Sequence, residues 1–129
     1  MSIVEYPFES ELLADRGYCL FPREIEDDAL VLFHATSDDR LEGIQKEGIK
    51  PGNEVGGTLS TISYATASST AFTHWTMTRK GGVDGVVLAL KFEDMSEIYE
   101  AEGTKRSRAL TRQPVIIGVC RIPSTYRHI

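Results

Sequence analysis

The residues of this chain that are best suited to chemistry begin with His34, which directly follows the apolar run 30–33. Two small residues, Ala35 and Thr36, come next. The apolar run is typical of a buried strand, so the imidazole and the backbone donors after it lie at a strand end. A polar ligand there can take hydrogen bonds from both. The alternative is that His34 only satisfies a hydrogen bond of the core.

A second candidate site is a basic cluster formed by Lys105, Arg106, Arg108 and Arg112. Arginine forks suit phosphate oxygens, so the cluster can hold a pyrophosphate or a nucleic-acid backbone; the alternative is a solvated loop. The whole chain carries a formal net charge of −5 at pH 7. Overall charge therefore argues against nonspecific capture of nucleic acid or anionic membranes, and a nucleic acid would have to use this cluster.

The elements that position these residues alternate between strands and helices early in the chain and are strands alone later. We expect strands over 29–34, 59–63, 85–92 and 115–120, and short helices over 9–16, 36–48 and from Ala67 to before Gly81. We expect a short strand over 18–21 and a charged surface segment over 23–28, whereas the secondary structure of 97–102 is ambiguous. His74 is expected on a solvent face of its helix. This order favours an α+β domain with helices flanking a sheet that is not uniformly parallel.

Length and composition indicate a single domain, residues 1–129, with an ordinary hydrophobic core. The chain has 129 residues, of which 41% are hydrophobic and 26% charged, and these values exclude disordered and fibrous classes. No apolar stretch is long enough to span a bilayer, and the first residues lack a signal-peptide pattern, so we expect a cytoplasmic protein with no membrane partner. We expect Cys19 and Cys120 to be reduced, buried thiols, and neither has metal-site spacing.

The segment around His34 resembles the opening motif of the ADP-ribosyltransferase superfamily, the enzymes that cleave NAD. In its histidine branch, which includes poly(ADP-ribose) polymerases and rifampin ADP-ribosyltransferases, a strand ends in His-Gly-Thr or a close variant and a helix follows. The residues from Glu47 to Pro51 match the glycine-containing turn that ends this helix. His34, Ala35 and Thr36 match the strand end, with Ala35 in place of the usual glycine. The resemblance implies a split β-sheet with short flanking helices, and NAD contacts at these three residues.

The second motif of that branch is a strand carrying a tyrosine, followed by Ser and Ala residues that open a helix. Residues 59–72 resemble it. The resemblance implies that Tyr64 stacks on the nicotinamide, although the register also fits Ser63, and that Ser60 and Ser69 contact NAD. The alternative for Tyr64 is an aromatic residue at the end of a half-buried strand.

The third motif carries the catalytic carboxylate. The rifampin-modifying type resembles this chain best here, because it is similarly short and has an aspartate after its central strand, then a polar stretch, a proline and an apolar strand. Asp94 matches that aspartate, with Glu93 as the alternative, and Gln113 lies where the commoner branches have a glutamate and is expected to contact NAD. A fixed anion stabilises the positive charge that develops on the ribose as nicotinamide leaves.

These resemblances imply an NAD-dependent mono-ADP-ribosyltransferase, a glycosyltransferase-class enzyme that takes NAD as substrate and modifies an unidentified protein, nucleic-acid or small-molecule acceptor. The candidate catalytic residues are His34, Tyr64 and Asp94. Two alternatives stay open: a non-catalytic module that holds NAD or ADP-ribose, and an inhibitory interaction protein of the same fold. The enzyme hypothesis requires the three side chains to share one hollow.

Overall fold

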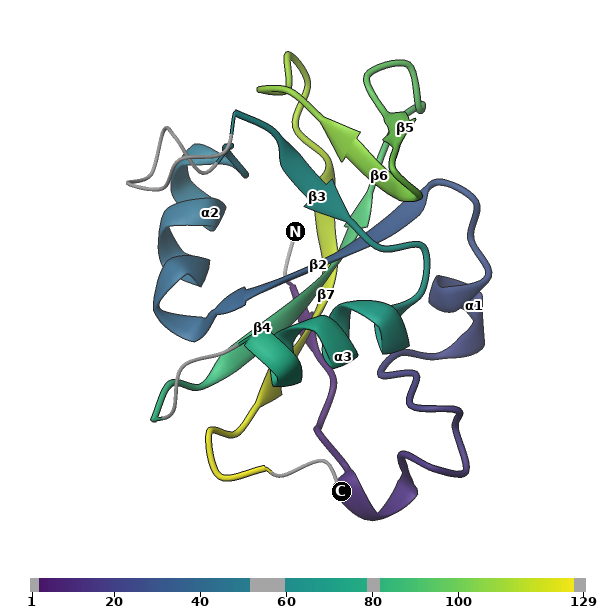
Figure 1. Ribbon diagram of the computed structural model, residues 1–129, viewed down its shortest axis with the longest axis vertical. Coiled ribbons are helices and arrows are strands. Elements are labelled where there is room, and N and C mark those ends of the chain that lie inside the picture. Colours follow the sequence, from purple (N-terminus) through teal and green to yellow (C-terminus); the bar gives the residue numbers. More distant parts are fainter. Residues whose placement is uncertain (1–2, 52–59, 79–81, 127–129) are drawn as a thin grey trace.

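The fold combines two β-sheets with a few short helices, and the expectation of an α+β class is confirmed (Figure 1). The computed structural model describes residues 3–51, 60–78 and 82–126. Its strands are β1 (Val4–Glu5), β2 (Val31–Ser37), β3 (Ile62–Tyr64), β4 (Gly85–Lys91), β5 (Tyr99–Ala101), β6 (Thr104–Ser107) and β7 (Val115–Ile122). Its α-helices are α1 (Arg23–Glu26), α2 (Leu41–Glu47) and α3 (Ser68–Thr78), and its 3-10 helices are η1 (Ser10–Leu12) and η2 (Asp38–Arg40).

The larger sheet has the strand order β1-β7-β4-β2, and the smaller sheet has the order β3-β6-β5. In the larger sheet β1 is parallel to β7, while β4 is antiparallel to both of its neighbours. The smaller sheet is antiparallel throughout. An isolated antiparallel bridge between Phe33 of β2 and Ala65, just after β3, joins the two sheets.

Strand β4 is apolar from Val86 to Leu90 because both faces of the larger sheet are covered. Alternate side chains of a strand point to opposite faces. Val87 and Ala89 pack under α3 and the N-terminal segment, in a cluster with Phe33 and Phe72. Val86, Leu88 and Leu90 belong to the other core cluster, which contains Leu41 of α2 and residues of the smaller sheet. The run of apolar residues that predicted this strand therefore reflects burial on two sides.

Several predicted boundaries were wrong. Strand β2 continues to Ser37, so Thr36 is a strand residue and not a helix cap, because its backbone pairs with Val86 of β4. The helix expected over 9–16 is reduced to η1 and turns, and no strand forms over 18–21, where Gly17 and Tyr18 both have positive φ, 61° and 63°. The charged segment 23–28 contains α1.

The ambiguous segment 97–102 contributes to a hairpin of β5 and β6 that the sequence reasoning missed. The loop between these strands is Glu102 and Gly103, with φ of 55° and 77°. A two-residue loop with both φ values positive matches the right-handed twist of the paired strands. Leu59 and the glycine at position 81, which bounded two predicted elements, lie outside the described residues.

Candidate functional site

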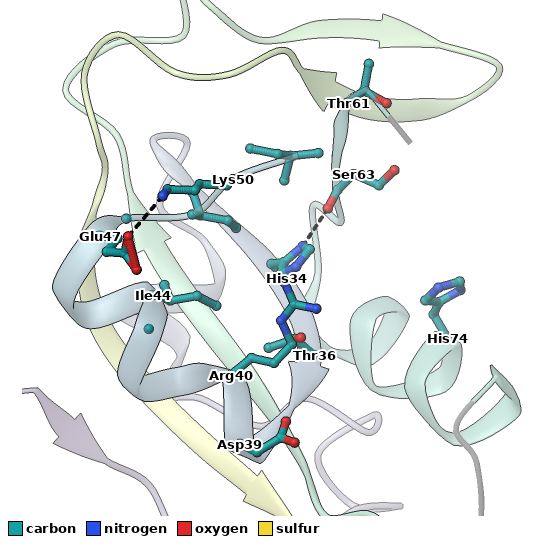
Figure 2. A pocket seen from close by; sticks show the side chains of 14 residues that line it. His34, Thr36, Asp39, Arg40, Ile44, Glu47, Lys50, Thr61, Ser63 and His74 are labelled. Atoms are coloured by element: carbon teal, nitrogen blue, oxygen red, sulfur yellow. Dashed lines mark hydrogen bonds and ion pairs between the residues drawn. The ribbon is translucent and has the colours of Figure 1, made fainter. Parts of the chain in front are cut away.

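A cavity of about 500 Å³ lies beside His34, between β2 of the larger sheet, β3 of the smaller sheet, α2 and α3. We call it the His34 cavity. Its polar lining includes His34, Thr36, Arg40, Lys50, Ser63 and His74, and Figure 2 shows these side chains around one hollow. This volume falls within the range of small-molecule sites, roughly 300–1,000 Å³.

The His34 ring is held in one orientation and one tautomer. Its Nδ1 lies 2.8 Å from the carbonyl oxygen of Ser63. A carbonyl oxygen only accepts hydrogen bonds, so Nδ1 carries the proton and donates it. Burial lowers the pKa of His34 below its ordinary value of 6.5; the Ser63 bond opposes this change, and the positive charges of Arg40 and His74 reinforce it. The ring is therefore neutral at pH 7, and Nε2 carries a lone pair.

The alternation of β2 decides which residues of the first motif reach the cavity. His34 and Thr36 line it. The Ala35 side chain lies on the opposite face of the sheet, where it packs against the core cluster that contains Phe33. The structure therefore does not place the Ala35 methyl group in the cavity.

Tyr64 lies in the core, with a relative exposure of 4%. Its hydroxyl is 2.7 Å from the Oγ of Ser107, and that Oγ donates to the carbonyl oxygen of Arg108 at 2.9 Å, so the phenol is the donor. The ring packs edge-on against Phe92 at a centroid distance of 5.6 Å, and burial raises the pKa of Tyr64 to about 12. In this packing the ring has no free face on which a nicotinamide could stack.

Asp94 lies in a different place from His34. It is exposed in the turn after β4 and lines a separate hollow of about 140 Å³ together with Glu93 and Arg112. The Asp94 carboxylate accepts hydrogen bonds from the hydroxyl and the backbone nitrogen of Ser96, at 2.6 and 2.9 Å, and these bonds lower the pKa of Asp94. The structure therefore does not bring His34, Tyr64 and Asp94 into one hollow.

The remaining predicted NAD contacts are dispersed. The side-chain amide of Gln113 binds the backbone of Ile49, accepting from its nitrogen at 2.9 Å and donating to its carbonyl at 3.2 Å. Ser60 is exposed and precedes the residues of the β3 segment that line the His34 cavity. Ser69 lines another hollow, of about 440 Å³, which it shares with Tyr18 and His74.

The basic cluster is largely neutralised by neighbouring acids. Lys105 pairs with Glu100 at 3.2 Å, and Arg106 lies 4.0 Å from Glu102. Arg112 pairs with Glu93 at 2.9 Å, and Arg108 is exposed. None of these four basic residues is among the described residues that line the His34 cavity.

Sequence reasoning gave no site role to several residues that line the cavity. Arg40 and Glu47 come from the η2–α2 segment and Lys50 follows α2, while His74, expected on a solvent face, is exposed and lies at the cavity rim. A usable signal was the recurrence of Arg40, Ile44 and Glu47 at helical spacing on one side of α2. Their approach to His34 depends on the turn at η2, which has no comparable pattern.

The described part of the chain has no cluster of three or more His, Cys, Asp and Glu side chains able to hold a metal ion. None of its helices combines the length and apolar character needed to cross a membrane. Comparisons with protein-family models, with curated proteins and with solved structures find no match for this chain. The case for a function therefore rests on the geometry of the His34 cavity.

Proposed function

We propose that this chain is a binding module for NAD or ADP-ribose, with an ADP-ribosyltransferase-like arrangement of its two sheets. The observation that carries the proposal is the fixed His34 tautomer, whose Nε2 has no hydrogen-bond partner among the described residues. A lone pair in a half-buried site accepts a hydrogen bond from a ligand hydroxyl, and a ribose offers two vicinal hydroxyls. The side chains of Thr36 and Ser63 add further polar contacts.

A second observation supports the same proposal. The two segments that resemble the first and second motifs of the superfamily, 32–50 and 59–72, both contribute to the His34 cavity, although they come from different sheets. The binding module is favoured over the enzyme because the predicted carboxylate, Asp94, lies in a separate hollow.

Isothermal titration with ADP-ribose and with NAD tests the proposal. We expect His34→Asn to weaken ADP-ribose binding about 2- to 12-fold, because Asn keeps a donor for Ser63 but loses the Nε2 acceptor, a loss of about 0.5–1.5 kcal/mol. Asp94→Ala serves as a control that leaves affinity unchanged. A ligand at 100 times its Kd adds about 2.7 kcal/mol to the free energy of unfolding and so raises the melting temperature. If neither ligand binds in the titration and neither raises the melting temperature, the proposal is wrong. The inhibitory interaction protein then becomes the better hypothesis.

Transfer of ADP-ribose with a carboxylate other than Asp94 is the second candidate function, and it is favoured by two carboxylates in the cavity lining, Asp39 and Glu47. In such a reaction the bond from the ribose to the nicotinamide nitrogen breaks, nicotinamide leaves with the electron pair, and an acceptor nucleophile bonds to the ribose and loses a proton. A carboxylate near the ribose stabilises the intervening positive charge. Release of nicotinamide that is lost in Glu47→Gln or Asp39→Asn and kept in Asp94→Ala is the expected sign of this activity.

A further inference from the structure

The charges around the His34 cavity are unevenly neutralised. Of its two carboxylates, Asp39 accepts a hydrogen bond from the hydroxyl of Ser37 at 2.6 Å. Glu47 pairs with Lys50 at 3.2 Å. Arg40 forms no ion pair with any residue that the structure describes, and the same holds for His74. Glu47 and Lys50 thus offset each other, while Arg40 carries a positive charge that no acid of the described residues pairs. Asp39, whose partner among the described residues is a neutral hydroxyl, carries an unpaired negative charge on the same lining.

Arg40 is an exposed residue whose side chain turns toward the cavity. Arg40 is the last residue of η2, at the junction of β2 and α2. Figure 2 shows its side chain extending past Thr36 toward His34, with the His74 ring coming from α3 on the other side. The charges of both residues act on the His34 ring, where they oppose its protonation. The guanidinium thus lies beside the His34 ring in the cavity lining (Figure 2).

We propose that Arg40 anchors the pyrophosphate of the ligand, so that the cavity selects phosphorylated ribosides over free nucleosides. A guanidinium presents a planar fork of donors that binds phosphate oxygens in pairs. In ADP-ribose the ribose hydroxyls and the pyrophosphate are neighbouring groups of one molecule. The hydroxyls suit the uncharged acceptor at His34, and the pyrophosphate suits the cation at Arg40. This inference rests on the proposed function and names the chemical feature that the cavity recognises.

Titrations with sodium pyrophosphate and with ADP-ribose test the inference on the full chain. They compare the wild type, Arg40→Gln and Arg23→Gln. Arg23 is an exposed residue of α1 that does not line the His34 cavity, so its variant removes the same charge elsewhere. We expect Arg40→Gln to weaken binding of both probes tenfold or more, because a hydrogen bond to a charged group is the strong kind. Arg23→Gln is expected to bind both as the wild type does.

The outcomes separate this inference from the proposed function. If ADP-ribose binds the wild type and Arg40→Gln equally well, the anchor is wrong and the proposed function stands. If pyrophosphate binds and depends on Arg40 while ADP-ribose and NAD do not bind, the anion site is supported and the proposed function fails. If neither probe binds, or if Arg23→Gln weakens binding as much as Arg40→Gln, the inference is overturned.

Discussion

A polar side chain of the candidate site can bind a ligand through those atoms that its hydrogen bonds within the protein leave unpaired. His34 uses one ring nitrogen on the Ser63 carbonyl and keeps the other. Tyr64 gives its only proton to Ser107. Gln113 uses both ends of its amide on the backbone of Ile49. Of these three predicted site residues, His34 alone keeps an unused polar atom facing a cavity.

Tyr64→Phe tests the structural role of the phenol. We expect the variant to lose about 0.5–1.5 kcal/mol of unfolding free energy, the usual worth of one hydrogen bond, since Ser107 still donates to Arg108. Urea denaturation measures this loss, and ADP-ribose affinity is expected to stay at the wild-type value. A tenfold loss of affinity with unchanged stability would show instead that the hydroxyl contacts the ligand.

Among the elements, the end of α2 is fixed from outside the helix. Gly48 closes α2 with a φ of 85°, and a Cβ built on it would lie 2.5 Å from the Cδ of Gln113. Gln113 sits before β7 and holds the backbone of Ile49 by two hydrogen bonds. Gln113 therefore fixes the α2 wall of the His34 cavity to the segment before β7. Glycine is the one residue type that fits beside Gln113 at position 48.

Gly48→Ala is expected to destabilise the protein by about 2–3 kcal/mol. Gly48 combines φ 85° with ψ 170°, a conformation that essentially only glycine adopts, so an alanine there costs about 1–3 kcal/mol. Displacing Gln113 also weakens its hydrogen bonds to Ile49. Gly43→Ala is the matched control within α2, because a Cβ there meets nothing within 4 Å. It is expected to stabilise by about 0.5–1 kcal/mol. Thermal denaturation of both variants measures the contrast, and equal melting temperatures would contradict it.

For the molecule as a whole, the half-buried His34 makes stability depend on pH. The pKa of His34 is lower in the folded protein than its ordinary value of 6.5. Below that value the unfolded chain takes up a proton that the folded chain resists, so protons favour unfolding. The contribution of neutral His34 is thus fully present above pH 6.5 and is lost as the pH falls through the folded pKa.

We expect the melting temperature of the wild type to fall relative to that of His34→Asn as the pH is lowered from 7.5 to 5. All other titrating groups are common to both proteins, so the difference between the two curves reports His34. A constant difference across this range would contradict a neutral His34 imidazole in the folded protein.

The parts of the fold that could be predicted are those in which local pattern and burial agree. The apolar runs of β2, β4 and β7 and the buried face of α3 are all visible in the sequence. The site was harder, because its assembly depends on turns. Tyr64 follows the strand alternation into the core, and the direction of the turn after β4 takes Asp94 away from His34. The alternation of Ile62 and Tyr64 is a signal for the burial of Tyr64, whereas the position of Asp94 has no signal in the spacing of the residues.

The bridge between the sheets also gives any ligand of the cavity a mechanical role. Phe33 and Ala65 exchange both backbone hydrogen bonds, each 2.8 Å long, and the contact from the next residue, His34, to Ser63 reinforces that seam. A ligand that hydrogen-bonds to the His34 imidazole therefore acts on the same contact between the two sheets. Binding of a ligand in the His34 cavity is therefore expected to slow amide hydrogen exchange around the Phe33–Ala65 bridge in both sheets. A local binding event would thus stiffen both sheets of the protein.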